Sequence, residues 1–173
     1  YRHASSSPRP IKFKKQSSAK KFLLTVFWDA HQVYVTDFLK PGATVNSSRY
    51  VQTLRNLRRR DCRVRGSLAP IILQYDNAHP HTLRETAEAL EKLNFEPIPH
   101  PPYSLDLASR DFYLFPLLKR DLKGTHYSSD DEVKAAVNSW IQEKSKEFFS
   151  DGMKKLVSRW EICIRVNGDY IEK

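Results

Sequence analysis

Two short apolar runs that each end on an aspartate constrain the fold of this chain most strongly. The run FLLTVFW (22–28) is rich in β-branched and aromatic residues, and it stops at Asp29. The run IILQY (71–75) is compact and apolar, as a buried strand is, and it stops at Asp76. Because ligand sites collect at the carboxyl ends of strands in open sheets, both carboxylates are candidates for a functional site.

The segments around these runs alternate between strand and helix patterns. The further expected elements are a second hairpin strand at 31–39, a turn at 40–43, a possible short strand at Thr44–Val45, a helix from Asn46 or Ser47 to about Arg60, a helix at 81–93, a strand at 95–99, and helices starting near Ser109, at Ser128 (to about Trp140) and near 150 (to about 164). This order suggests an α/β fold, a mixed sheet flanked by helices, and it is compatible with a ribonuclease-H-like domain.

The first 21 residues differ in composition from the rest of the chain. They are rich in Ser, Pro and Lys and poor in apolar residues, which indicates a linker or arm. We therefore expect an arm at 1–21 and one folded domain at 22–173.

Charge gives the first indication of a partner. Lys and Arg number 29 against 20 Asp and Glu, which gives a formal net charge of +9. Such an excess favours phosphate backbones or anionic membranes, although a merely solvated basic surface fits equally well. No apolar run is long enough to span a bilayer, and no signal peptide is visible, so we expect no membrane partner.

The densest basic run lies in the helix expected after Asn46. Helical spacing puts Arg55, Arg58 and Arg59 on one broad face, and Arg63 follows a turn later. These four residues are candidates for binding DNA phosphates; a solvated helix face is the alternative for each one.

The cysteine content points to a reducing compartment. Cys62 and Cys163 are the two cysteines of the chain, about a hundred residues apart. They make neither a disulfide framework nor a zinc ligand set. An intracellular protein is the simpler interpretation.

A third carboxylate completes a candidate metal site. Asp111 opens the helix that follows a proline-rich loop, and it joins Asp29 and Asp76 as an oxygen donor suited to Mg²⁺ or Mn²⁺. Two such ions can activate an attacking oxygen and stabilise a leaving one. Taken singly, an aspartate at such positions is more often a turn former or a helix-start residue.

Five sequence blocks, in a fixed order, favour the metal-site interpretation of these aspartates over the structural one. They are TVFWD (25–29), DFLKPGATVNSSRY (37–50), YDNAHPH (75–81), HPPYSLDLASRDFYLF (100–115) and RVNGDYIEK (165–173). Together they resemble the signature blocks of mariner-family transposases over nearly the whole chain. In that family the three metal-binding carboxylates correspond to Asp29, Asp76 and Asp111, and the 34 residues between the last two (77–110) are the spacing typical of the mariner group.

The resemblance implies a ribonuclease-H-like (retroviral-integrase-like) fold that cuts DNA at transposon ends and joins the freed 3′ hydroxyl to target DNA. It also implies two Mg²⁺ or Mn²⁺ ions during catalysis, DNA as partner, a possible homodimer and a nuclear location. Helix-turn-helix modules or a fused domain are expected upstream of this sequence. Without such modules, DNA binding should be electrostatic rather than sequence-specific.

Four residues depart from the family pattern. The family usually has Arg at the position of His79, Pro at that of Leu105, and Pro-Ser at that of Ser109-Arg110. Because proline restricts the backbone, the loop before Asp111 should be less rigid here. The alternative to an active enzyme is a weakened remnant that binds nucleic acid or dimerises in a larger protein, as in the known fusion of a histone methyltransferase with a mariner transposase.

Other candidates have mainly structural interpretations. His79 and His81 follow Asp76 and could bind metal or phosphate, but such histidines more often satisfy backbone groups. Asp106 could be confused with Asp111, which the 34-residue spacing favours. The three tryptophans are expected in the core, with Trp28 packing beneath Asp29.

Overall fold

The computed structural model describes residues 23–40, 42–75, 84–101 and 104–167. The expected arm at 1–21 lies outside them. Among the described residues, every helix is too short or too polar to cross a bilayer. Cys62 and Cys163 are both half-buried and free.

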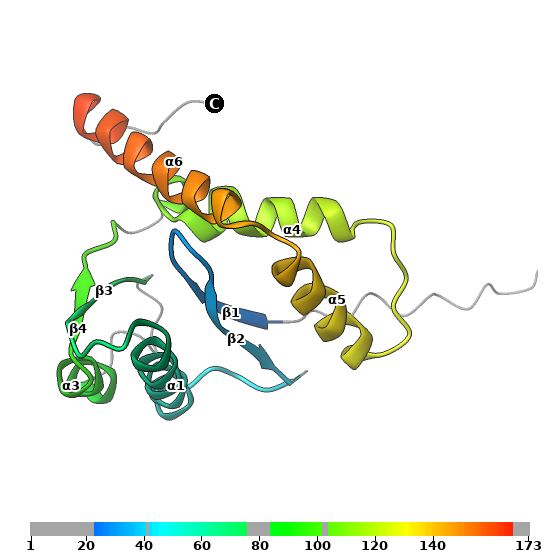
Figure 1. Cartoon of the computed structure of the whole chain (residues 1–173), viewed down its shortest axis with the longest axis horizontal. Helices are drawn as coiled ribbons and strands as arrows, with labels where there is room; N and C mark the ends of the chain where they lie inside the picture. Colours follow the sequence, from blue (N-terminus) through cyan, green and yellow to red (C-terminus); the bar gives the residue numbers. More distant parts are fainter. Residues whose placement is uncertain (1–22, 41, 76–83, 102–103, 168–173) are drawn as a thin grey trace, which may run out of the picture.

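A β-hairpin lies in the middle of the molecule, between two groups of helices (Figure 1). Its strands are β1 (Leu23–Trp28) and β2 (Val33–Leu39), which pair antiparallel as predicted. The register is irregular between Phe27 and Trp28, where β1 reaches the turn. Such a bulge increases the local twist and redirects the residues that follow it, here Asp29.

Helix α1 (Ser47–Arg65) lies along one side of the hairpin. It begins as predicted, because the Asn46 side chain accepts a hydrogen bond from the Arg49 N–H. Its predicted end at about Arg60 is wrong. No helix breaker occurs before Gly66, whose left-handed backbone (φ 63°) ends the helix.

The second pair of strands is parallel. It consists of β3 (Ile71–Gln74) and β4 (Phe95–Ile98), joined by a connection that contains α3 (Arg84–Lys92). The described strands thus form two two-stranded sheets rather than the one mixed sheet expected. Residues of β1 and β3 line one cavity, but these two strands are not hydrogen-bonded to each other.

The predicted strand at Thr44–Val45 is also wrong. The described residues between β2 and α1 contain no strand, and Val45 instead packs against the core below α1. A β-branched residue can satisfy this apolar contact without a partner strand.

The C-terminal half is helical and covers the opposite side of the hairpin (Figure 1). Its elements are the 3₁₀ turn η1 (Leu105–Leu107), the π-helical turn η2 (Arg110–Leu114), α4 (Phe115–Leu122), α5 (Asp130–Gln142) and α6 (Lys146–Arg165). The hydroxyl of Ser129, not Ser128, caps α5 by accepting from the Glu132 N–H. Helix α6 starts earlier than predicted, because Ser145 caps it through the Phe148 N–H.

The hairpin supplies side chains to two cores. On one face, Phe27 packs with residues of α1, β3 and α3, among them Leu54, Leu73 and Leu90. On the other face, Val26 packs with residues of η2, α4 and α5. Successive residues of a strand point to opposite faces, so one short strand can join both halves of the molecule. Asp29, which follows β1, is therefore positioned by a strand that packs against both cores.

Candidate active site

Asp29 lies in the turn of the central hairpin, directly after β1. Its backbone N–H donates to the Gln32 carbonyl at 3.0 Å. Its carboxylate Oδ1 accepts the backbone N–H groups of His31 at 2.7 Å and Gln32 at 3.0 Å. Aspartate commonly stabilises turns by such bonds to the backbone just ahead. The turn therefore fixes the direction of the carboxylate.

The second oxygen of Asp29 faces a tyrosine and an arginine. Oδ2 accepts the Tyr34 hydroxyl at 3.0 Å and Nη2 of Arg65 at 2.7 Å. Burial by itself would raise the pKa of Asp29, but the N–H groups of His31 and Gln32 and the side chains of Arg65 and Tyr34 outweigh it and lower the pKa below its ordinary value. Asp29 is therefore ionised at neutral pH.

Arg65 and Asp61 belong to this site and were missed by the sequence analysis. Asp61 is 4% exposed, and its Oδ1 lies 3.0 Å from Nε of Arg65. The same Nε donates to the Tyr34 hydroxyl at 3.1 Å, a bond that, with the Asp29 and Asp61 carboxylates, raises the pKa of Arg65. The available signal was the four-residue spacing of Asp61 and Arg65, which places them on one helix face.

Asp111 lies in η2, the wide turn that leads into α4. The N–H groups of Asp111 and Phe112 both donate to the Ala108 carbonyl, at 2.9 and 3.2 Å. Arg110 Nε lies 3.1 Å from Asp111 Oδ2. Single π-helical turns are rare and occur frequently at functional sites. The helix predicted near Ser109 is thus present, with an unusual first turn that carries the candidate carboxylate.

Three side chains anchor the loop before Asp111. The Leu107 carbonyl accepts Nε2 of Gln74 at 2.8 Å and Nε1 of Trp160 at 3.4 Å. Arg159 donates to the Asp106 carbonyl at 3.3 Å. Gln74 is the last residue of β3, while Trp160 and Arg159 lie on α6. The loop that lacks the family's prolines is therefore hydrogen-bonded both to β3 and to α6.

Trp28 packs beneath the site, as predicted. Its ring stacks on Tyr113 of η2, with centroids 6.4 Å apart and planes 13° apart, and lies 6.0 Å from Phe149 of α6. Of the three tryptophans expected in the core, Trp140 is buried, at 5% exposure, whereas Trp28 and Trp160 are half-buried. Through this stack, the residue before Asp29 contacts the turn that carries Asp111.

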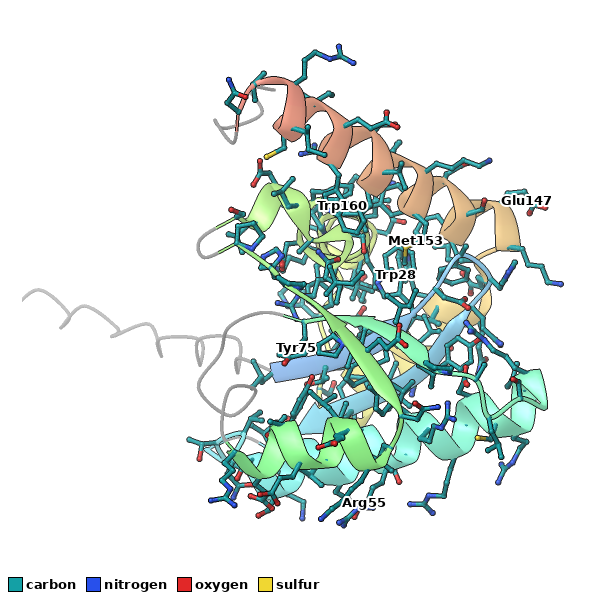
Figure 2. All side chains as sticks on the ribbon, turned by 90° about the vertical axis from the view of Figure 1, so that its left-hand side faces the viewer. Trp28, Arg55, Tyr75, Glu147, Met153 and Trp160 are labelled. Carbon is teal, nitrogen blue, oxygen red and sulfur yellow. The ribbon has the colours of Figure 1, made fainter. Side chains whose placement is uncertain are left out.

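Asp29 and Asp111 line the same cavity, of about 810 Å³. Figure 2 shows part of its wall, where Trp28, Met153 and Trp160 gather between α6 and the strands, with Tyr75 at the end of β3 nearby. Asp106 is not among the residues that line this cavity, so the geometry favours Asp111 over it. Asp76, His79 and His81 lie outside the described residues.

The donor chemistry of the cavity fits a hard divalent cation. Asp29 and Asp111 offer carboxylate oxygens, the donors that Mg²⁺ and Mn²⁺ prefer. In this structure each of these carboxylates is paired with an arginine, Asp29 with Arg65 and Asp111 with Arg110. Within the part of the chain that is described, no three His, Cys, Asp or Glu residues are grouped as a metal site. The third predicted ligand, Asp76, lies outside that part.

The predicted DNA-binding arginines divide into two kinds. Arg55, Arg59 and Arg63 are exposed and follow one another at four-residue spacing along α1. Figure 2 shows Arg55 on the outer side of α1, pointing away from the residues of the cavity. The Arg58 side chain is 11% exposed, and its guanidinium donates to the Leu68 and Ala69 carbonyls. Arg58 therefore holds the chain after α1.

Comparisons with known proteins agree with this arrangement. A family model described as Transposase (partial DDE domain) matches residues 3–67. The Mariner Mos1 transposase of Drosophila mauritiana is 39% identical over 173 residues, which cover 98% of this chain and 49% of that protein. Histone-lysine N-methyltransferase SETMAR of Homo sapiens is 32% identical over 169 residues, 95% of this chain and 24% of that protein.

Solved structures of the Mos1 transposase are also similar to this chain. The crystal structure of the catalytic domain of Mos1 mariner transposase superposes with a TM-score of 0.84 at 39% identity, covering 88% of this chain and 77% of that one. A Mos1 paired-end complex with Mn superposes with a TM-score of 0.84 at 40% identity, over 99% of this chain and 49% of that one.

The fold and the carboxylate-lined cavity define a ribonuclease-H-like α/β domain, which confirms the predicted fold class. Sequence identity extends over the whole of this domain and places it among the transposases. The chain belongs to the mariner family. It spans about half the length of the Mos1 transposase and about a quarter of the methyltransferase fusion.

Proposed function

We propose that this chain is the catalytic domain of a mariner-type transposase, which cuts DNA strands and joins them with the help of divalent metal ions. The observation that supports it most is that Asp29 and Asp111, which are far apart in sequence, line one cavity. The resemblance of YDNAHPH (75–81) to a mariner block supports Asp76 as the third carboxylate.

In this proposal Asp29, Asp76 and Asp111 hold Mg²⁺ or Mn²⁺. When bound, two such ions stabilise the attacking and leaving oxygens of a phosphodiester. The chain's own contribution is to orient the oxygens. The hairpin turn fixes Asp29 through the His31 and Gln32 amides, and the anchored loop positions the turn that carries Asp111. Holding reacting groups in place accounts for much of the rate of such enzymes.

DNA is the proposed partner, with a second copy of the chain beside it on the DNA. Solved Mos1 structures include paired-end complexes and a strand transfer complex. The net charge of +9 supports binding of phosphates by this chain. Because the relatives are transposases and a histone methyltransferase fusion, the proposed location is the nucleus.

Nicking of supercoiled plasmid in the presence of Mn²⁺ tests the proposal. The wild type should nick, whereas Asp29→Asn, Asp76→Ala and Asp111→Asn should each lose activity on the order of a hundredfold or more, because neither an amide nor a methyl group can supply the negative charge that holds the metal ions. Mg²⁺ should support less nicking than Mn²⁺, since it demands stricter octahedral geometry.

Asp106→Asn is the matched control, because Asp106 lies in the loop just before Asp111 but does not line the cavity. It should nick like the wild type. Loss of nicking in Asp106→Asn but not in Asp111→Asn would overturn the assignment of the third carboxylate.

The pairing of Asp29 with Arg65 and of Asp111 with Arg110 favours one second candidate, a transposase remnant that binds DNA without cutting it. The same assay separates the two. Equal inactivity of the wild type and Asp111→Asn, with DNA binding retained in both, would establish the remnant.

A further inference from the structure

The carboxylate of Asp29 has no acceptor position left for a metal ion in this structure. A carboxylate offers about four lone-pair directions. Oδ1 accepts two backbone N–H groups, from His31 and Gln32, and Oδ2 accepts the Tyr34 hydroxyl and the Arg65 guanidinium. A cation that binds Asp29 must therefore replace at least one of these four donors.

Arg65 is the donor that a metal ion would replace most readily. The His31 and Gln32 amides belong to the hairpin turn itself, and the Tyr34 side chain is packed in the core. The Arg65 side chain is 45% exposed, at the C-terminal end of α1. It also carries a positive charge, which a divalent cation on the same oxygen would repel.

A second carboxylate keeps Arg65 in place when the contact to Asp29 is lost. Asp61 Oδ1 lies 3.0 Å from Arg65 Nε, whereas Asp29 Oδ2 contacts Nη2, a different nitrogen of the same guanidinium. The guanidinium also lies 5.5 Å from the centre of the Tyr34 ring. Arg65 can therefore release Asp29 and stay bound to Asp61 and Tyr34.

From these contacts we infer that Arg65 is an internal cation that occupies the metal-binding oxygen of Asp29, and that a divalent ion binds Asp29 by displacing it. Asp61 is then a positioning residue that retains the displaced guanidinium. This inference rests on the proposed function, because it takes Asp29 as a metal ligand. It adds that competition from Arg65 lowers the affinity of Asp29 for a divalent ion.

Mn²⁺ binding to the DNA-free protein, measured by calorimetry or by electron paramagnetic resonance, tests this inference without an activity readout. Arg65→Gln should bind Mn²⁺ about three- to tenfold more tightly than the wild type, because a half-exposed ion pair and its repulsion of the metal are both removed. Arg60→Gln removes the same charge from an exposed position of α1 and should bind Mn²⁺ like the wild type.

Thermal unfolding gives a second measurement. Without metal, Arg65→Gln should have a lower melting temperature than Arg60→Gln, since Asp29 and Asp61 each lose the ion pair with Arg65, although Asp61 keeps Arg58 at 3.7 Å. Saturating Mn²⁺ should narrow that difference, because the ion replaces the guanidinium at Asp29. Arg65→Lys keeps the charge and serves in both measurements if Arg65→Gln does not fold; it should bind Mn²⁺ no more weakly than the wild type.

The outcomes separate this inference from the proposed function. If the wild type binds no Mn²⁺, or Asp29→Asn binds it as well as the wild type, the proposed metal site fails and the inference fails with it. If the wild type binds through Asp29 but folded Arg65→Gln binds equally or more weakly, only the displacement by metal is refuted.

Discussion

At the scale of single residues, the backbone at Ser109 already has the shape that proline imposes. Its φ is −57°, and the residue before it, Ala108, is extended (φ −114°, ψ 113°). The Phe112 N–H donates to the Ala108 carbonyl, which makes Ser109 the first residue of the helical turn, a position that favours proline. The backbone at Ser109 is therefore one that a proline could adopt.

Ser109→Pro should raise the free energy of unfolding by about 0.5–1 kcal/mol, because it restricts the unfolded chain without straining the folded one. Urea denaturation measures the change. Ser158→Pro, in the middle of α6, is the control and should lower the free energy of unfolding by about 3 kcal/mol or more. A destabilised Ser109→Pro would mean that the buried surroundings of Ser109 have no room for the ring.

Asp29 and Arg65 illustrate how far the sequence predicts single residues. Asp29 could be identified because a strand pattern ends on it and a family block contains it. Arg65 was not singled out, since composition does not distinguish an arginine that faces solvent from one that pairs with a carboxylate on another element. That distinction depends on the packing of α1 against β2, which local sequence does not encode.

At the scale of elements, Gly152 allows α6 to approach the site closely. A Cβ atom at this position would lie 2.7 Å from Trp28 Cη2 and 2.7 and 2.8 Å from Tyr113 Cδ1 and Cε1. These distances are far shorter than van der Waals contacts. Helix α6 therefore cannot carry a side chain where it crosses the Trp28–Tyr113 stack.

Gly152→Ala should lower the free energy of unfolding by about 1–3 kcal/mol, because overpacking outweighs the higher helix propensity of alanine. Chemical denaturation measures the loss, and near-ultraviolet circular dichroism should report the displaced Trp28. Ser158→Ala, on the exposed side of α6, should change the stability little. An unchanged Gly152→Ala would show that α6 can move outward at no cost.

Element types were predicted better than element ends. The hairpin and the start of α1 follow from alternation and from the Asn46 cap, which are local signals. The start of α6 was missed because its Ser145 cap lacks the acidic residue of a capping box. The expected single sheet depends on long-range pairing of β1 with β3, and a local pattern does not specify which strand edges meet.

At the scale of the whole molecule, one group of basic residues lies in a row along a single helix. Arg55, Arg59 and Arg63 form an exposed stripe along α1, defined here as the α1 stripe. Figure 2 places Arg55 on the outer side of the molecule, away from the cavity between α6 and the strands. The α1 stripe contains neither Arg65 nor Arg110, the arginines that pair with the carboxylates. Binding of DNA and binding of metal should be separable by mutation.

Changing the α1 stripe to glutamine at all three positions should weaken duplex binding for every sequence tested and leave Mn²⁺ affinity unchanged. Each arginine that contacts a phosphate contributes about one unit to the slope of log affinity against log salt, so the slope should fall by up to about three. Titrations of duplex DNA at several salt concentrations measure this slope.

The matched control replaces three exposed lysines of other helices or their ends with glutamine: Lys92, Lys119 and Lys123. Because it removes the same charge from other surfaces, it should lower the slope by less than one unit. An equal loss in both triple variants would mean that DNA responds to the net charge of +9 rather than to the α1 stripe.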